Sequence, residues 1–417
     1  GEAVLDMCAS PGSKTSQIAE FMDGMGVLVA NERSRKRCNL LVANIQRHRS
    51  RVTIVSNHDG RHIPSLSGEG GYDAILVDAP CTGSGTTRKN PEVWRQWKPS
   101  GGLGLHSMQV GLLSRAVDLL KPGGRVVYST CSLDPVENEA VVSQILESRN
   151  DVRLIDCSDT MGGISIQEGL QSWVPTDDHM QPLDGSSWAY PPSKEISQDL
   201  RKCVRVRGHM MDAGGFFFAK IEKKRVHTNG DLDCISEVRL PEDSVQASQP
   251  LSEEDLFAFQ KEFGSCDKQL WRRGKKIAVG TERMIDVWKK RTRVSNGKAI
   301  VEGRRWRPMK IVHVGCEISE IRSGRPSRII QDGAHLAREV AIDRIVIIED
   351  EDFEKLLSGE AIETDRIPST KRDIRGGWLV SSDSNPEPLP VWIGGKITAM
   401  MSKHEQTCRV GLRGLDR

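Results

Sequence analysis

The stretch YDAILVDAPCTGSG spans residues 72–85. Its first residues are nearly all apolar up to Asp78, and a Pro-Cys turn with several small residues follows. A strand that is apolar along its whole length is typical of a parallel sheet covered by helices on both faces. We therefore predict a buried strand over residues 72–78, with Asp78 and Cys81 at its carboxyl end.

Short apolar runs and helical patterns alternate on both sides of this strand. The other predicted elements are strands over 3–8, 26–32, 52–57 and 125–132, and helices over 13–22, 34–48, 105–120 and 137–146. A later apolar run, 216–221, predicts one more strand that would close the sheet. This order predicts an α/β fold, a Rossmann-like sheet with helices on both faces. In such sheets ligands bind at the carboxyl ends of the strands.

The 417 residues allow two or three domains. Residues 223–250 are polar and rich in turn formers, so we predict a linker there. It would separate a first domain, 1–222, from a smaller C-terminal domain of mixed α/β type, 251–417. Within that second domain, residues 268–310 hold 15 Lys or Arg against three Asp or Glu. Such a local excess predicts an anionic partner.

The composition excludes several classes of protein. Charged residues make up 28% and apolar residues 37%, as expected for a globular chain that is neither disordered nor fibrous. No run approaches 18 uninterrupted apolar residues, so we predict no membrane span. The ten cysteines are scattered without CxxC pairs, which indicates a reducing compartment rather than a disulfide framework. We expect no metal, and interpret the acidic run Glu349–Asp352 as a solvated patch.

Polar residues follow the first three predicted strands at the same edge. Residues 8–14 read CASPGSK, a turn that brings backbone N–H groups and a helix start near a small ligand, although Pro-Gly-Ser is also an ordinary turn. Glu32 and Asp59 end the next two strands, where carboxylates can contact a ribose or an adenine. Each of them is equally compatible with a helix cap. Together, the three strand ends favour a nucleoside pocket.

Two cysteines follow strands that are predicted to be neighbours. Cys81 comes three residues after Asp78, and Cys131 lies in the segment Ser129–Ser132. A single cysteine at a strand end is most often part of the core. Two cysteines beside a carboxylate, at the edge where ligands bind, predict a catalytic site.

Four segments resemble the signature motifs of the Nop/Sun family of S-adenosylmethionine-dependent RNA cytosine-5 methyltransferases. They are CASPGSKT (8–15), DAPCTGSG (78–85), RKNPEVW (88–94) and YSTCSLDPVENE (128–139). The likeness covers roughly residues 1–222, including Gly214–Phe217, and the paired Pro-Cys and Thr-Cys motifs are highly specific. Met309–Cys316 and Gln331–Gly333 carry a weaker likeness to the multi-site tRNA branch. The family usually has RNA-binding sequence before the first motif, and we expect the natural N-terminus to precede Gly1.

The resemblance implies a role for each matching residue. Cys131 is the expected nucleophile, Cys81 acts in product release, and Asp78 hydrogen-bonds both the base and the cofactor. Glu32 is expected at the ribose of S-adenosylmethionine and Asp59 at its adenine. The loop expected around the amino-acid end of the cofactor is made of Cys8, Ala9, Ser10, Pro11, Gly12, Ser13 and Lys14. Candidates for RNA contacts are Arg88, Lys89 and Asn90, although Lys14 and Lys89 are also compatible with solvated surface lysines.

The chemistry explains why a thiol is needed. Carbon 5 of cytosine is too weak a nucleophile to attack a methyl sulfonium directly. A thiolate that adds to carbon 6 places electron density on carbon 5 and divides one hard step into easier ones. The base must also leave its stack, at a cost on the order of a few kcal/mol. Single-stranded or bent RNA lowers that cost, and we expect tRNA as the substrate.

The basic stretch 268–310 is expected to follow RNA phosphates. Its Trp271, Trp288 and Trp306 either stack on bases or fill the core of the second domain, and the core is the better interpretation for tryptophan. Alternatives to a tRNA methyltransferase are an inactive RNA-binding scaffold, an enzyme for rRNA or mRNA, and a DNA cytosine methyltransferase with Cys81 as nucleophile. We expect a nuclear or cytoplasmic location and no obligate protein partner.

Overall fold

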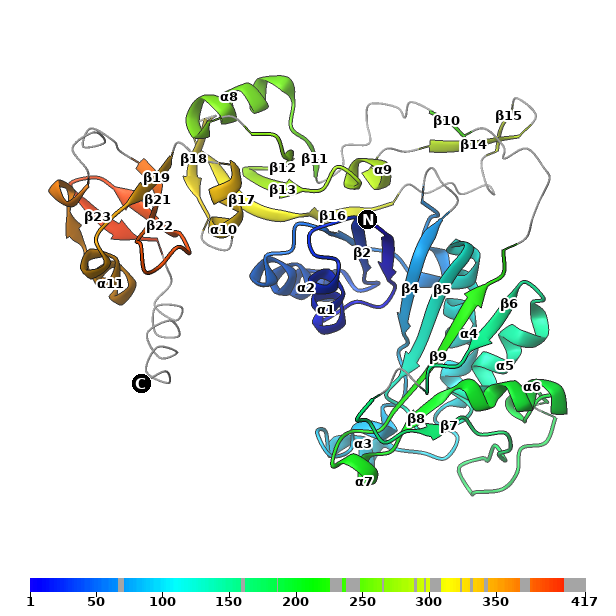
Figure 1. Ribbon diagram of the computed structural model, residues 1–417. Helices are drawn as coiled ribbons and strands as arrows, with labels where there is room; N and C mark the ends of the chain where they lie inside the picture. The colour runs from blue at the N-terminus through cyan, green and yellow to red at the C-terminus, as the bar shows by residue number, and fades with distance from the viewer. Residues whose placement is uncertain are drawn as a thin grey trace.

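A computed structural model gives the fold (Figure 1). It describes residues 1–66, 71–158, 162–185, 187–225, 235–237, 248–264, 266–288, 291–295, 298–300, 309–322, 325–330, 333–340, 344–367 and 376–400. Within these ranges, no helix combines the length and the apolar character that a membrane crossing requires.

One large mixed sheet contains the predicted strands. Its hydrogen-bonded order is β16-β3-β2-β1-β4-β5-β9-β8-β7, and β6 also pairs with β9. Neighbours from β3 to β5 are parallel, and the other strands are antiparallel to their partners. The bounds are β1 Ala3–Asp6, β2 Val27–Asn31, β3 Thr53–Ser56, β4 Tyr72–Asp78, β5 Leu120–Thr130, β6 Val152–Ile155, β7 Gln167–Glu168, β8 Val204–Val206, β9 Phe216–Lys223 and β16 Ile311–Val314. The predicted Rossmann-like α/β fold is confirmed.

Helices cover both faces of this sheet. They include α1 Ser13–Phe21, α2 Arg35–His48, α4 Leu103–Leu119 and α5 Glu139–Ser148. Successive side chains of a strand point to opposite faces, so β1 contributes to two cores. Val4 belongs to a buried cluster with Ala19 of α1, whereas the adjacent Leu5 belongs to a cluster with Leu113 of α4. Right-handed crossovers in opposite directions from β1 and β4 place these helices on opposite faces.

The loops that follow the parallel strands leave the sheet at one edge. Asn31 lies opposite Ser56, and Asp78 lies opposite Ser129, so the carboxyl ends of β2, β3, β4 and β5 are level. We call this edge the carboxyl rim. The motifs singled out in the sequence follow these strands and β1, as the strand pattern predicted.

The predicted bounds of one strand are wrong at both ends. β5 begins at Leu120, directly after α4, so residues 121–124, which lie between the predicted helix and the predicted strand, belong to β5. At its other end β5 stops at Thr130, which places Cys131 in the following loop. Successive side chains of a strand point to opposite faces of the sheet, and a residue in a loop is not bound by this pattern.

The C-terminal part of the chain contains three smaller sheets (Figure 1). One has the strands β11 Gln249–Pro250, β12 Gln269–Arg273, β13 Lys276–Gly280, β17 Cys316–Arg322 and β18 Arg325–Ile329, and another has β19 Ile345–Ile347, β20 Ile362–Glu363, β21 Gly376–Ser381, β22 Leu389–Ile393 and β23 Lys396–Ala399. The third has β10 Ile235–Glu237, β14 Arg291–Ser295 and β15 Lys298–Ile300. The described helices of this part are α8 Glu253–Phe263, α9 Met284–Trp288, α10 Ala334–Val340 and α11 Asp350–Ser358.

One strand of the C-terminal part belongs to the large sheet. β16 pairs antiparallel with β3, and Ile311 lies opposite Ser56 at the carboxyl rim. Gly315 then leads the chain into β17 with a φ of +62°, and a side chain there would collide with the carbonyl oxygen of Val279. A separate C-terminal domain over 251–417 stays a prediction. One strand of this region, β16, pairs with the large sheet, and the other described strands of the region form smaller sheets.

Parts of the predicted linker, 223–250, form strands. β9 continues to Lys223, residues 235–237 form β10 beside β14, and β11 covers Gln249–Pro250. Residues 226–234 and 238–247 lie outside the described residues.

A buried ion pair joins β8 to the start of α5. Arg205 donates to both oxygens of Glu139, with Nε–Oε1 2.6 Å and Nη2–Oε2 2.5 Å, and also to the carbonyl of Leu133 at 3.0 Å. The two side chains are only 2% and 0% exposed. In Arg205→Met the carboxylate stays buried without its cation, so we expect a loss of about 3–5 kcal/mol in the free energy of unfolding. Urea unfolding followed by tryptophan fluorescence measures it.

Arg153→Met provides a matched control. Arg153 pairs with Glu222 at 2.9 Å, but 60% of its side chain is exposed. An exposed pair is screened by water, and we expect a loss below about 1 kcal/mol. Equal losses in the two variants would contradict the structural role of the buried pair.

Candidate active site

The two predicted cysteines lie together at the carboxyl rim. The Sγ atoms of Cys81 and Cys131 are 3.2 Å apart, close enough to share a hydrogen bond. Cys81 lies in the loop after β4, and Cys131 directly follows β5. Both side chains are partly exposed. The prediction that parallel strand ends would bring these residues together is therefore correct in geometry.

Small residues after Cys81 allow the two loops to approach. Gly85 N donates to the carbonyl of Cys131 at 2.8 Å, and Gly215 N donates to the carbonyl of Gly85 at 2.7 Å. A side chain at Gly85 would place its Cβ 2.7 Å from the Cys131 oxygen. The glycine is thus required by the close passage of the two backbones.

The surroundings make the two thiols unequal. Their mutual hydrogen bond lowers the pKa of Cys131 to about 7, with a contribution from the Lys14 ammonium. The same bond, together with burial and the nearby Glu137 carboxylate, raises the pKa of Cys81. Cys131 is therefore the thiol that ionises near neutral pH, which is the property that a nucleophile needs.

Asp78 connects the loop after β1 to the end of β5. Its Oδ2 accepts from Lys14 Nζ at 2.9 Å, and its Oδ1 accepts from Ser129 Oγ at 2.9 Å. Lys14 also lies over the ring of Phe216, 5.4 Å from the centroid. Lys14 thus pairs within the site, while 41% of its side chain stays exposed. Both oxygens of Asp78 thus already accept hydrogen bonds from the protein.

Side chains of α2 fix the backbone of the loop after β1. Arg37 Nη2 donates to the carbonyl of Ser10 at 2.7 Å, and Asn44 Nδ2 donates to the carbonyl of Pro11 at 2.6 Å. These contacts hold the loop at the start of α1, where free N–H groups and the helix dipole favour a negatively charged ligand group. The contact of this loop with the amino-acid end of a cofactor stays a prediction.

Glu32 and Asp59 lie at the carboxyl rim, but each already has partners. Glu32 Oε1 accepts from the N–H of Ser34 at 2.7 Å, and its Oε2 lies 3.4 Å from Arg37 Nη1. Asp59 receives hydrogen bonds from Arg61, which lower the pKa of Asp59 to about 2. Asp59 thus caps the short helix Gly60–His62 by accepting from the N–H of Arg61, whereas α2 begins at Arg35 without a side-chain cap from Glu32. The ribose and adenine contacts stay predictions.

Asp6, at the end of β1, is a further polar residue of the site that was not predicted from the sequence. Its side chain is buried, Thr15 Oγ1 donates to its Oδ2 at 2.7 Å, and its Oδ1 has no hydrogen-bond partner among the described residues. Burial raises the pKa of Asp6 to about 6, and burial also raises the pKa of the nearby Cys8 thiol. A charged residue inside an otherwise apolar strand, AVLDM, is the pattern that would have identified it.

Three consecutive residues behind the cysteine loops belong to a quoted motif, but no separate role was predicted for any of them. Glu137, Asn138 and Glu139 are fully buried, although all three are polar. Glu137 accepts hydrogen bonds from Thr82 and Ser132, which directly follow the two cysteines, and Asn138 Nδ2 donates to the carbonyl of Ser132 at 2.9 Å. Buried polar groups need such partners, so these residues hold the loops in place.

The residues predicted to contact RNA lie beyond the Cys81 loop. Arg88 forms a two-pronged ion pair with Asp212, with distances of 2.9 and 3.0 Å. The N–H groups of Lys89 and Asn90 donate to the carbonyl of Thr86 and form a turn. The Lys89 side chain is exposed and forms no ion pair with any residue that the structure describes. The RNA contacts stay predictions.

The tryptophans of the basic stretch support the core interpretation. Trp271 is 1% exposed and packs edge-on against Trp288, with the ring centroids 6.2 Å apart. Trp288 Nε1 donates to the carbonyl of Ser248 at 3.0 Å. Base stacking on Trp271 is therefore wrong, because its ring is enclosed by protein. Trp306 lies outside the described residues.

Cations of the same stretch pair with acids of the C-terminal part. Arg272 lies 2.6 Å from Asp255, and Lys276 lies 2.9 Å from Glu317. These side chains are thus already used within the fold, which reduces the charge that the stretch offers to an anion. The side chains of residues 289–308 lie outside the described part of the chain.

The acidic run 349–352 begins α11. Asp350 accepts from Ser384 Oγ at 2.6 Å, and Glu351 pairs with Lys355 at 2.7 Å. Acidic side chains at a helix start are stabilised by the helix dipole. Across the described ranges, no cluster of three or more His, Cys, Asp or Glu is arranged to bind a metal ion.

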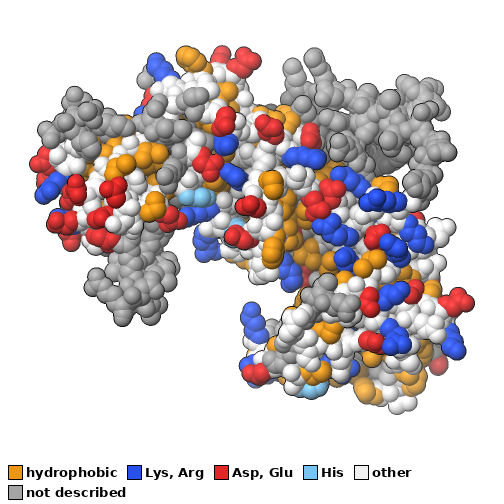
Figure 2. Space-filling view, viewed as in Figure 1, with side chains coloured by type: hydrophobic (Ala, Val, Ile, Leu, Met, Phe, Trp, Pro, Cys, Tyr) orange, Lys and Arg blue, Asp and Glu red, His pale blue; other side chains and the backbone are white. Residues whose placement is uncertain are grey.

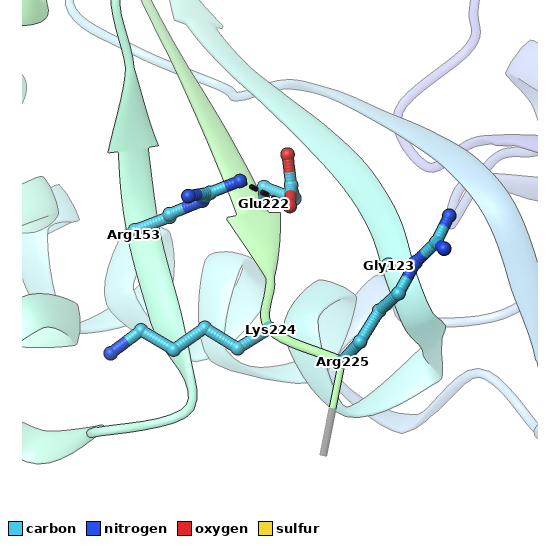
Figure 3. Close-up of a pocket in the computed structure, with 5 residues that line it drawn as sticks. All are labelled: Gly123, Arg153, Glu222, Lys224 and Arg225. Atoms are coloured by element: carbon cyan, nitrogen blue, oxygen red, sulfur yellow. Dashed lines mark hydrogen bonds and ion pairs between the residues drawn. The ribbon is translucent and has the colours of Figure 1, made fainter. Parts of the chain in front are cut away.

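A separate hollow lies at the end of β5 that is opposite to the two cysteines (Figure 3). It is lined by Gly123, Arg153, Glu222, Lys224 and Arg225. Arg153 pairs with Glu222, while Lys224 and Arg225 extend in different directions (Figure 3). Figure 2 shows further Lys and Arg side chains over β5, β6 and β9, with acidic side chains among them. The polar groups that line this hollow do not converge on one point, whereas those of a small-molecule site do.

Comparisons with known proteins agree with the motifs. The multisite-specific tRNA:(cytosine-C(5))-methyltransferase of Saccharomyces cerevisiae is 38% identical over 255 residues, which are 56% of this chain and 37% of that protein. The tRNA (cytosine(34)-C(5))-methyltransferase of Drosophila melanogaster is 34% identical over 290 residues, 62% of this chain and 38% of that protein. NSun6 from Pyrococcus horikoshii has a solved structure that matches 53% of this chain and 48% of its own, with 26% identity and a TM-score of 0.41. This chain therefore spans less than two fifths of the two sequence relatives.

A family model described as 16S rRNA methyltransferase RsmB/F matches residues 1–222. The match covers more than half of the 417 residues and contains β1 to β5 with both cysteine loops. The resemblance to RNA cytosine-5 methyltransferases is confirmed by the relatives. The chain belongs to the RsmB/F methyltransferase family.

Proposed function

We propose that this chain is the catalytic part of an S-adenosylmethionine-dependent RNA cytosine-5 methyltransferase that acts on tRNA. One observation carries the proposal: two thiols 3.2 Å apart at the carboxyl rim, with a lowered pKa at Cys131. The family match and the tRNA methyltransferases among the relatives support the reaction and the substrate.

In the proposed mechanism Cys131 is the nucleophile. Its thiolate adds to carbon 6 of cytosine, and the electrons of the C5–C6 double bond move toward carbon 5 and the ring nitrogen at position 3. Carbon 5 then takes the methyl group and loses its proton to a base. The double bond forms again as Cys131 leaves as a thiolate. Cys81, in contact with Cys131, is proposed to act in this release.

Asp78 is proposed to stabilise the electron-rich ring. A proton shared between Asp78 and the ring nitrogen at position 3 makes carbon 6 more electrophilic. In the structure Lys14 and Ser129 occupy both oxygens of Asp78. An incoming base therefore has to replace one of these donors or to bring the proton with it.

The residues of the rim fit S-adenosylmethionine, which supplies a methyl group on a positively charged sulfur. The unpartnered oxygen of buried Asp6 offers an acceptor where the amino-acid end of the cofactor is expected. The fixed backbone of the loop after β1 offers N–H donors for its carboxylate. Glu32 and Asp59 would accept hydrogen bonds from the nucleoside once their present partners yield.

A second candidate substrate is rRNA, because the description of the matching family names 16S rRNA. Both substrates use the same chemistry at Cys131, so the site alone does not separate them. Bisulfite sequencing of RNA from cells with and without the protein tests both. We expect particular tRNA cytosines to lose their methylation when the protein is removed and to regain it when the protein returns. Unchanged methylation in every RNA would contradict the proposed function.

A further inference from the structure

We propose that His58 is a positioning residue that couples the C-terminal part of the chain to the cofactor pocket. Its side chain accepts a hydrogen bond from the backbone just before β16 and thereby holds the loop after β3, residues 57–59, in the form that receives the nucleoside of S-adenosylmethionine. The inference rests on the proposed function for the identity of the cofactor. It goes further by making the C-terminal part a contributor to cofactor binding.

β16 reaches the loop after β3 at the carboxyl rim. It continues through Gly315 into β17, so it joins the C-terminal sheets to the large sheet (Figure 1). At the rim, Asn57 N donates to the carbonyl of Lys310 at 3.0 Å, and Lys310 N donates to Nε2 of His58 at 2.8 Å. The strand pair therefore ends in a contact between the backbone of the C-terminal part and a side chain of the loop.

Asn31, at the end of β2, holds the backbone of His58. Its Oδ1 accepts from the N–H of His58 at 3.0 Å, and its Nδ2 donates to the carbonyls of His58 and Met7, each at 3.0 Å. Asn31 and His58 are both buried. The backbone of His58 is thus fixed from β2, while its ring is fixed by the residue that precedes β16.

The same loop lies between the two residues predicted to hold the nucleoside. Asn57 Nδ2 donates to the carbonyl of Glu32 at 2.8 Å and to that of Arg33 at 2.9 Å, and Asp59 directly follows His58. Glu32 and Asp59 are the carboxylates expected at the ribose and the adenine. The hydrogen bonds to Lys310 therefore act on the segment that joins these two expected contacts.

Loss of the His58 contact would loosen this segment in the free protein. The cofactor would then have to order residues 57–59 as it binds, and that ordering lowers its affinity. The cysteine loops lie on other strands, so the effect is on binding and not on the chemistry. Coupling between two sites is reciprocal, so a cofactor that favours the ordered loop must also strengthen the attachment of β16.

Two substitutions of His58 separate the hydrogen bond from the volume of the ring. A neutral imidazole accepts at Nε2 only when its proton lies on Nδ1, and a glutamine can place its amide oxygen at a similar position. His58→Gln therefore keeps an acceptor for the N–H of Lys310. His58→Leu fills the space but leaves that N–H without this partner.

The first experiment is calorimetric titration of the full chain with S-adenosylhomocysteine, which carries the same nucleoside as the cofactor. We expect His58→Leu to bind it on the order of tenfold more weakly, a usual size for coupling between two sites. We expect His58→Gln to restore most of the affinity. Unchanged affinity in folded His58→Leu, or an equal loss in both variants, would overturn the role of the hydrogen bond.

Thr281→Val is the matched control. Thr281 also attaches the C-terminal part to the large sheet, because its Oγ1 donates to the carbonyl of Gly26 at 2.6 Å. Gly26 precedes the start of β2, at the edge opposite to the carboxyl rim. We expect this variant to bind S-adenosylhomocysteine as the unsubstituted protein does. A loss equal to that in His58→Leu would show that any loosening of the C-terminal part lowers affinity, which would overturn the specific role of His58.

Hydrogen exchange provides a second readout that needs no substitution and decides the question even if His58→Leu does not fold. We expect bound S-adenosylhomocysteine to slow deuterium exchange at the N–H of Lys310 and to leave β17, residues 316–322, unchanged. Exchange at Lys310 that does not respond to the ligand would contradict the coupling. A chain that binds no S-adenosylhomocysteine would overturn the proposed function and this inference together, whereas equal binding by all variants would overturn this inference alone.

Discussion

Replacing Cys131 with alanine is expected to abolish methyl transfer to RNA. Without the thiol nothing adds to carbon 6, and carbon 5 stays too weak a nucleophile to accept the methyl group. Asp78, Lys14 and the loop after β1 are unchanged in this variant, so the cofactor should still bind. Transfer of a radiolabelled methyl group from S-adenosylmethionine to tRNA measures the loss.

The control for this prediction is Cys266→Ala. Cys266 is also partly buried, but it lies in the C-terminal part of the chain, where its Sγ donates to the carbonyl of Lys268 at 3.8 Å and its side chain packs against a hydrophobic cluster. Its substitution should leave the transfer rate of the folded protein unchanged. Methyl transfer that persists in Cys131→Ala would exclude Cys131 as the nucleophile.

Replacing Cys81 with alanine is expected to trap the protein on its RNA. Cys131 should still add to carbon 6, and carbon 5 should still be methylated. Release needs the proton on carbon 5 to leave, and this variant lacks the group proposed to assist that step. The expected result is a protein–RNA adduct that survives denaturant and migrates as a slower band in a denaturing gel.

The two variants together assign the roles. An adduct in Cys81→Ala but not in Cys131→Ala supports Cys131 as the nucleophile. The opposite pattern would reverse the assignment and would agree with the DNA-type arrangement, in which the cysteine of the Pro-Cys motif attacks. Adducts in neither variant, with methylation intact, would contradict covalent catalysis at this pair.

The sequence was sufficient to predict the sheet that carries the site. Uniformly apolar strands such as residues 72–78, separated by helical patterns, specify a parallel order almost by themselves, and the carboxyl rim follows from that order. This is why the sequence alone predicts that Asp78, Cys81 and Cys131 lie together. The contacts that hold the cysteine loops could not be predicted, since Glu137 meets Thr82 and Gln109 only in the folded chain.

The C-terminal part was predicted less well, for a physical reason. A short apolar run such as residues 311–314 indicates a strand, but the choice of partner depends on contacts with residues far away in the sequence. In the same way, an excess of Lys and Arg over 268–310 does not show that Asp255 and Glu317 lie within reach of them. Local sequence patterns indicate the helices and strands, whereas tertiary structure decides which strands and which charged side chains pair.

The position of β16 has a consequence for synthesis of the chain. β3 is complete once residue 56 has left the ribosome, yet its outer partner, residues 311–314, emerges more than 250 residues later. During that interval β3 presents a row of unpaired N–H and C=O groups, which invites pairing with other nascent chains. Protection of this edge by chaperones during translation would therefore matter more here than in a methyltransferase whose sheet closes with neighbouring sequence.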